Sequence, residues 1–189
     1  MSAAASFTAF AGHRMLASGD LRQVAAAVAK CPTPALILDD ATGALVELDL
    51  RQGPEHAARE FQARTAAVDP VPPAKSGRGR PRLGVVAREV TLLPRHWDWL
   101  ASQPGGASAA LRRLVDEARR ANAGPDEARR ARDAIYRAMT VLGGDLPGFE
   151  EACRALFAGD SERLRAQFEP WPRDVATYLQ ILLDRRPAG

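Results

Sequence analysis

The sequence predicts an α+β protein in which a small mixed unit comes first and a mainly helical half follows. Three observations predict this class. Hydrophobic residues make up 46% and charged residues 26% of the 189 residues, which is typical of a globular chain. Short apolar runs bounded by turn residues fill the first 50 positions, as is typical of strands. Beyond position 94, apolar residues recur at helical spacing behind Ser, Asp and Pro residues that begin helices.

The first part of the chain predicts the order β-β-α-β-β, followed by one short helix. Turn residues at 12–14 and at 40–43 join the two pairs of strands. Ser18 or Asp20 is placed to cap the helix between the pairs. The predicted strands lie at 5–11, 15–18, 34–40 and 44–50, and the helices at 20–30 and 55–64.

The helix at 20–30 has one apolar face. Packed on one side of the sheet, this face would bury Val24, Ala27 and Val28. Their expected partners on the third strand are Leu36 and Leu38. This packing gives the mixed unit a single core.

A basic segment rich in proline and glycine divides the chain. Four prolines lie between positions 70 and 81, with three glycines nearby, so the segment is predicted to be extended. The division predicts a small α+β domain over 1–66, a basic linker over 67–83, and a strand with a helical bundle over 84–189.

The last part of the chain predicts one strand and six helices. Ser108 is a possible cap for the second helix, and Pro125 suits the first turn of the third. The sequence DEARR occurs at 116–120 and again at 126–130, and predicts exposed faces with charge pairs one turn apart. The strand is expected at 87–93, and the helices at 95–103, 107–122, 125–142, 147–160, 161–169 and 172–186.

Basic residues concentrate in the linker. Between Val71 and Arg88 there are five basic residues and no acid, namely Lys75, Arg78, Arg80, Arg82 and Arg88. Two arginines separated by glycine on an extended chain fit a narrow negative channel such as the A·T-rich minor groove. The core Arg78-Gly79-Arg80-Pro81 resembles the AT-hook, a short motif that binds this groove. The alternative is a basic linker exposed to solvent.

The order strand, helix, helix after the linker resembles the ribbon-helix-helix fold of bacterial repressors. In that family two chains pair their strands into a ribbon that enters the major groove. The resemblance implies a ribbon over Ala87–Leu93 and a phosphate clamp at the start of the second helix. It also implies a homodimer. The clamp would be formed by Gly106, Ala107 and Ser108, with Arg95 and His96 close to the DNA backbone.

The sequence leaves the phase of this strand open, and the first helix is about one turn shorter than is usual in that family. With Leu93 toward the core, Arg88, Val90 and Leu92 face the DNA. In the other phase, Val86, Val90 and Leu92 are buried while Glu89 and Thr91 face outward. Neither phase offers a polar face for reading bases. The alternative is a strand and two helices in an ordinary core.

Tryptophan and cysteine residues are expected to be structural. Trp97 shares a helical face with Leu100 and is predicted to lie in the core, whereas Trp99 is expected at an interface. Cys31 and Cys153 are far apart in the sequence, which predicts buried free thiols in a reducing compartment.

The sequence predicts no enzyme, no metal site and no cofactor. Asp39 and Asp40 follow a strand, where carboxylates can act as acid and base, but they also begin a hairpin turn. One histidine between two glutamates is a weak metal pattern, and His13 falls in a turn. The motifs of hydrolases, P-loop proteins and dinucleotide-binding proteins do not occur. The histidine and glutamates in question are Glu55, His56 and Glu60.

Four stretches covering about half the chain resemble a widespread bacterial family of small proteins of unknown function. They read TAFAGHRMLASGD, GRGRPRLGVVAREVTLLPRHWDWL, QPGGASAALRRLVDEARR and GDLPGFEEACRALFAGD. This resemblance implies no activity.

We expect a DNA-binding transcriptional regulator or nucleoid-associated factor that acts as a homodimer on A·T-rich DNA. The first domain would sense an effector or support dimerisation, and the last helices would brace the dimer. The alternative is a protein-interaction adaptor that does not bind DNA. The N-terminus does not resemble a signal peptide, and no apolar run is long enough to span a membrane, so we expect a cytoplasmic location in the nucleoid.

Overall fold

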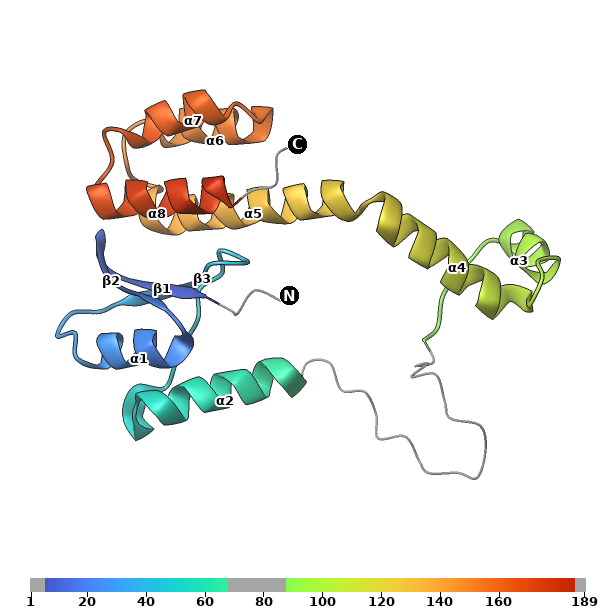
Figure 1. Ribbon diagram of the computed structural model, residues 1–189, viewed down its shortest axis with the longest axis horizontal. Coiled ribbons are helices and arrows are strands. Elements are labelled where there is room, and N and C mark those ends of the chain that lie inside the picture. Colours follow the sequence, from blue (N-terminus) through green and yellow to red (C-terminus); the bar gives the residue numbers. More distant parts are fainter. Residues whose placement is uncertain (1–5, 68–87, 186–189) are drawn as a thin grey trace. The chain divides into compact units, whose positions relative to one another are not determined.

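The structure is a computed structural model, and it describes residues 6–67 and 88–185. The chain forms two compact units (Figure 1). The first, here called the core unit, combines residues 1–64 with residues 124–189. The second, the inserted unit, consists of residues 65–123. The sequence-based division placed residues 1–66 and the last helices in separate domains, whereas here they belong to one unit.

A three-stranded antiparallel sheet lies at the centre of the core unit. Its strands are β1 (Phe7–Ala11), β2 (Arg14–Gly19) and β3 (Leu36–Asp39), in the order β2-β1-β3. The fourth predicted strand, at 44–50, does not form. Only Leu45 makes an isolated bridge, to Leu38, and a 3₁₀ turn follows at Leu50–Gln52. The predicted α+β class is confirmed, but the expected β-β-α-β-β order is wrong in its last strand.

Helix α1 (Leu21–Ala29) covers one face of the sheet (Figure 1). Asp20 caps it, because its carboxylate accepts the backbone N–H groups of Arg22 and Gln23 at 2.9 and 3.0 Å. Val24 is fully buried, as predicted.

The strand residue that meets α1 is not the predicted one. Ile37 packs in this core with Val24, whereas Leu38 points to the opposite face and Leu36 is exposed. Ala27 and Val28 are only partly buried. Both faces of β3 are covered near Leu38, so apolar residues occur on both sides of the strand. The apolar pattern alone therefore could not identify the side that packs on α1, and the sequence-based assignment chose the wrong one.

The opposite face of the sheet is covered by the C-terminal helices. Phe10 and Leu38 share one buried cluster with residues of α5, α6, α7 and α8. The rings of Phe10 and Tyr178 meet edge to face, with their centroids 5.4 Å apart. The helices of the core unit are α2 (Pro54–Ala67), α5 (Ala123–Gly143), α6 (Phe149–Ala158), α7 (Ser161–Phe168) and α8 (Arg173–Asp184). They confirm the helices predicted in these regions.

Asp40 joins the end of β3 to α8. Its side chain is 3% exposed, and its carboxylate accepts the Ser6 hydroxyl at 2.7 Å and the Tyr178 hydroxyl at 3.0 Å. The Arg185 guanidinium lies 3.6 Å away. Burial, together with the neighbouring carboxylate, raises the pKa of Tyr178, so the hydroxyl stays protonated and donates. The sequence placed Asp40 only in a turn, and its pairing with α8 needs the tertiary structure.

The structure also shows where the two cysteines and the weak metal pattern lie. Cys31 and Cys153 are free but only partly buried, and burial raises the pKa of the Cys153 thiol. His56 Nδ1 lies 4.0 Å from Glu60. Over 6–67 and 88–185, no group of three His, Cys, Asp or Glu side chains is arranged to hold a metal ion.

Replacing Tyr178 with Phe is expected to lower the free energy of unfolding by about 1–3 kcal/mol, because Asp40 loses a buried donor while staying buried. Urea unfolding followed by circular dichroism measures this. Tyr136→Phe is the matched control, since its ring is exposed and a change close to zero is expected. Equal losses in the two variants would contradict the role given to the Asp40 bond.

The same hydroxyl predicts a pH dependence. Because the pKa of Tyr178 is raised in the folded state, its contribution to stability is present below its unfolded pKa of about 10 and is lost as pH rises beyond it. Urea midpoints measured across this range should fall more steeply for the wild type than for Tyr178→Phe. Urea midpoints that fall in parallel for the wild type and Tyr178→Phe would contradict the raised pKa of Tyr178.

Candidate nucleic-acid interface

All of the residues predicted to bind DNA belong to the inserted unit. Its described part consists of residues 65–67 and 88–123, including helices α3 (Pro94–Ala101) and α4 (Gly106–Ala121), which pack on each other. The predicted AT-hook residues lie outside the described residues. They are Lys75, Arg78, Gly79, Arg80, Pro81 and Arg82.

The predicted ribbon strand does not form in this single chain. Residues 88–93 form no β-strand. No described strand lies beside them to pair with their backbone N–H and C=O groups. Arg88 and Thr91 are exposed. Leu92 is the one partly buried residue of 88–93, while Val90 and Leu93 are exposed. With both Val90 and Leu93 exposed, the single chain reproduces neither of the two phases that the sequence left open.

Helix α3 begins at Pro94, whose fixed φ and missing N–H suit a first turn. Arg95 and His96 follow in that turn and are exposed. No hydrogen bond or ion pair among the described residues joins either side chain to the start of α4. Leu100 is buried as predicted, but Trp97 is 42% exposed, so its prediction as a core residue is wrong.

Helix α4 begins at Gly106, where the phosphate clamp was predicted. Gly105 precedes it with φ of 82°, a left-handed conformation that favours glycine, and acts as the cap. Ser108 is therefore not the cap. It lies within the first turn, and its hydroxyl accepts Arg112 Nη1 at 3.3 Å. The N–H groups of Ala107 and Ser108 belong to the turn that lacks intrahelical acceptors.

An arginine stripe runs along α4 and was not singled out from the sequence. It consists of Arg112, Arg113, Arg119 and Arg120, two pairs seven residues apart, which places them on one side of the helix. All four are exposed, and among the described residues none lies within 4 Å of a carboxylate.

The two DEARR copies therefore differ. In the second, Arg129 pairs with Asp126 at 2.8 Å, as predicted. In the first, Arg120 Nε donates at 3.2 Å to the backbone oxygen of Asp116 instead of to its carboxylate, so the predicted pair is absent. The recurring double arginine is the signal that could have identified this stripe.

Positive charge is concentrated in the inserted unit. Residues 65–123 contain ten Lys and Arg residues and five Asp and Glu residues, a net charge of +5. The rest of the chain contains 16 basic and 18 acidic residues, a net charge of −2. The net charge of +3 for the whole chain hides this separation.

The inserted unit also exposes an apolar surface. Within 88–123, only Leu100 and Ala110 are buried apolar residues. Large apolar side chains from the 88–93 segment, α3 and α4 stay exposed, with Val115 54% exposed. The exposed set, here called the apolar surface, consists of Val90, Leu93, Trp97, Trp99, Leu114 and Val115.

Comparison with known proteins places the whole fold in one family. A family model described as "Uncharacterized protein conserved in bacteria (DUF2239)" matches residues 6–183. The chain belongs to this family. The matched span includes residues of both the core unit and the inserted unit. No curated protein and no solved structure matches the chain.

Outside the gaps at 1–5, 68–87 and 186–189, the chain has no helix long and apolar enough to cross a membrane.

Replacing both Arg119 and Arg120 with Gln is expected to change the free energy of unfolding by less than about 0.5 kcal/mol, because neither makes an ion pair. Gly105→Ala serves as the contrast and should cost about 1–2 kcal/mol, since alanine at φ of 82° is strained. Urea unfolding measures both. A large loss in the arginine variant would show that the stripe is structural.

Proposed function

We propose that this protein is a DNA-binding homodimer, a transcriptional regulator or nucleoid-associated factor, that uses the inserted unit to hold A·T-rich DNA. The observation that carries the proposal is the charge separation, +5 in the inserted unit against −2 in the rest of the chain. A basic region on an otherwise acidic protein is the electrostatic signature of a nucleic-acid-binding surface.

The arginines divide into two groups by expected role. Arg78 and Arg80, in their Arg-Gly-Arg-Pro context, enter the minor groove and provide the A·T preference. The arginine stripe of α4 follows the phosphate backbone, because two turns of helix extend it over roughly 10 Å. Arg88, Arg95 and the first turn of α4 add further phosphate contacts.

Dimerisation is supported by how little the inserted unit buries. In residues 88–123, two apolar residues are buried and six large apolar side chains stay exposed, and exposed apolar patches mark interaction surfaces. A second copy would cover the apolar surface. It would also pair with residues 88–93 as an antiparallel ribbon, in the manner of the ribbon-helix-helix family. The resemblance to the ribbon-helix-helix family and to the AT-hook is part of this proposal.

The alternative is an interaction adaptor. Trp97 and Trp99 are exposed on one short helix, and tryptophan is enriched at protein interfaces. An acidic protein could then dock on the inserted unit in place of DNA. The following experiments distinguish the two functions.

Binding to fluorescent A·T-rich and G·C-rich duplexes, measured by anisotropy at two salt concentrations, tests the proposal. We expect a preference for A·T and an affinity that falls with salt by a slope of about −0.9 per phosphate contact. Arg80→Ala should cost about 1–3 kcal/mol on the A·T duplex and less on the other. Arg119→Gln with Arg120→Gln should weaken both equally and reduce the salt slope.

Arg22→Ala is the matched control for these titrations. Arg22 is an exposed arginine on α1 in the core unit, so its loss should leave both affinities unchanged. Absence of binding to either duplex at low salt would overturn the DNA-binding function and leave the adaptor.

Light scattering of the free protein tests the dimer separately. The wild type should have twice the mass of the 20.3 kDa chain. Val115→Lys should shift it to the monomer, because it places a charge in the apolar surface. Ile181→Lys, at an exposed position on α8, should stay dimeric. A monomeric wild type would contradict the ribbon formed by residues 88–93 of two chains.

A further inference from the structure

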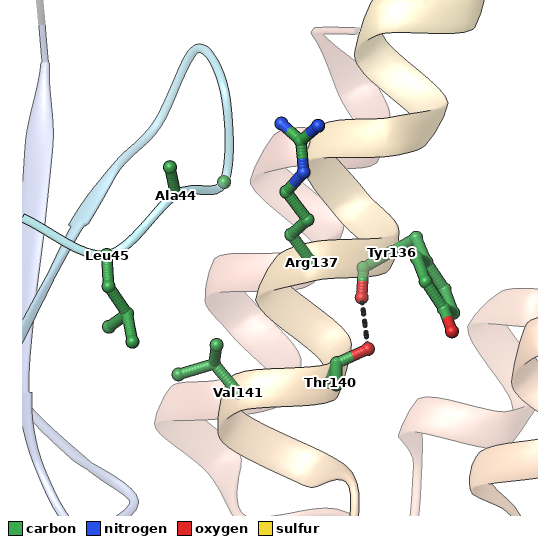
Figure 2. Close-up of a pocket in the computed structure, with 7 residues that line it drawn as sticks. Ala44, Leu45, Tyr136, Arg137, Thr140 and Val141 are labelled. Atoms are coloured by element: carbon green, nitrogen blue, oxygen red, sulfur yellow. Dashed lines mark hydrogen bonds between the residues drawn. The ribbon is translucent and has the colours of Figure 1, made fainter.

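A small apolar pocket lies in the core unit, between the loop after β3 and helix α5. Its volume is about 250 Å³. Figure 2 shows Leu45 on the loop and Val141 on α5 facing one another across it. The remaining lining residues are Gly43, Ala44, Tyr136, Arg137 and Thr140.

The pocket depends on a close approach that only glycine permits. Gly43 is buried and has φ of 65°, and a Cβ at this position would lie 2.1 Å from the carbonyl oxygen of Ala134. The loop backbone therefore rests directly on α5. The loop is also held by its own turns, since Asp39 accepts the Ala41 N–H at 2.8 Å. The wall of the pocket is thus fixed before any ligand arrives.

Arg137 is held at the rim of this pocket. Its Nη1 donates to the carbonyl oxygen of Thr42 at 2.9 Å, which fixes the guanidinium beside the loop. A guanidinium has several other N–H donors, and no carboxylate of the described residues lies within 4 Å of them. Asp133, one turn earlier on α5, lies 4.0 Å from Arg132 instead. The positive charge is positioned but not neutralised.

The walls below this charge are apolar and incompletely covered. Leu45 is 50% exposed, although it is a large aliphatic side chain. The Thr140 hydroxyl donates to the Tyr136 carbonyl oxygen at 2.9 Å, so it does not compete for a ligand. The ring of Tyr136 packs on Phe157 with centroids 5.4 Å apart and forms a firm border.

We propose that this pocket binds a small organic acid, with its apolar body between Leu45 and Val141 and its carboxylate on Arg137. Ligand sites are mostly apolar with a few placed polar or charged groups, and this open hollow suits a ligand smaller than a drug molecule. A guanidinium holds a carboxylate through two parallel hydrogen bonds. The inference goes beyond DNA binding and does not depend on it.

Titration of the full-length ¹⁵N-labelled protein with sodium benzoate, followed by NMR, tests the site. We expect saturable shifts at the amides of residues 43–45 and 136–141. Benzyl alcohol, which has the same ring without the charge, should bind roughly tenfold more weakly. Sodium chloride at equal ionic strength should shift none of these amides in a saturable manner.

Variants identify the groups responsible. Arg137→Gln should weaken benzoate roughly tenfold, because it removes the charge, and leave benzyl alcohol nearly unchanged. The variant also removes the bond to the Thr42 carbonyl oxygen, and the unchanged affinity for benzyl alcohol would show that the pocket stays intact. Leu45→Ser should weaken both probes. Arg130→Gln is the control, since Arg130 is an exposed arginine on α5 that does not line the pocket.

Three outcomes would overturn the proposal. They are no saturable shift with benzoate, equal affinity for benzoate and benzyl alcohol, and full affinity in Arg137→Gln. The DNA titrations are independent of these results, so failure of one proposal leaves the other testable.

Discussion

The architecture depends on the need to cover both faces of a three-stranded sheet. Helix α1 covers one face through Val24, and the other face carries Phe10 and Leu38, which stay buried only because the C-terminal helices pack on them. The buried Asp40 strengthens this second contact through its bond to Tyr178. A sheet this small would not be stable with one apolar face exposed to water, because exposed apolar area costs roughly 25 cal/mol per Å².

This constraint does not involve residues 65–123. Since the core unit is completed by residues 124–185, the segment between its two halves need not contribute to that core. Its described side chains, in 88–123, are unusual for a folded domain. The arginines of α4 lack carboxylate partners among the described residues, and large apolar residues such as Val115 stay exposed. Side chains left in this state are available for binding.

The two proposed sites fit this division. The inserted unit has the positive charge and the exposed apolar side chains that the proposed DNA-binding dimer would use, while the core unit has an open apolar hollow with Arg137 at its rim. In the proposed regulator the ligand site and the DNA-binding surface would lie in different units, because the core unit is completed without residues 65–123. The membership in an uncharacterised bacterial family, matched over 6–183, covers both parts.

The sequence by itself determined the elements whose signals are local. The helices at the end of the chain, the Asp20 cap and the first three strands follow from periodicity and capping, which act within a few residues. Only the tertiary structure decided which face of β3 meets α1, the loss of the fourth strand, the burial of Asp40 and the seating of Gly43 on α5. These depend on partners more than 90 positions away or on both faces of a strand being covered, and local patterns do not contain that information.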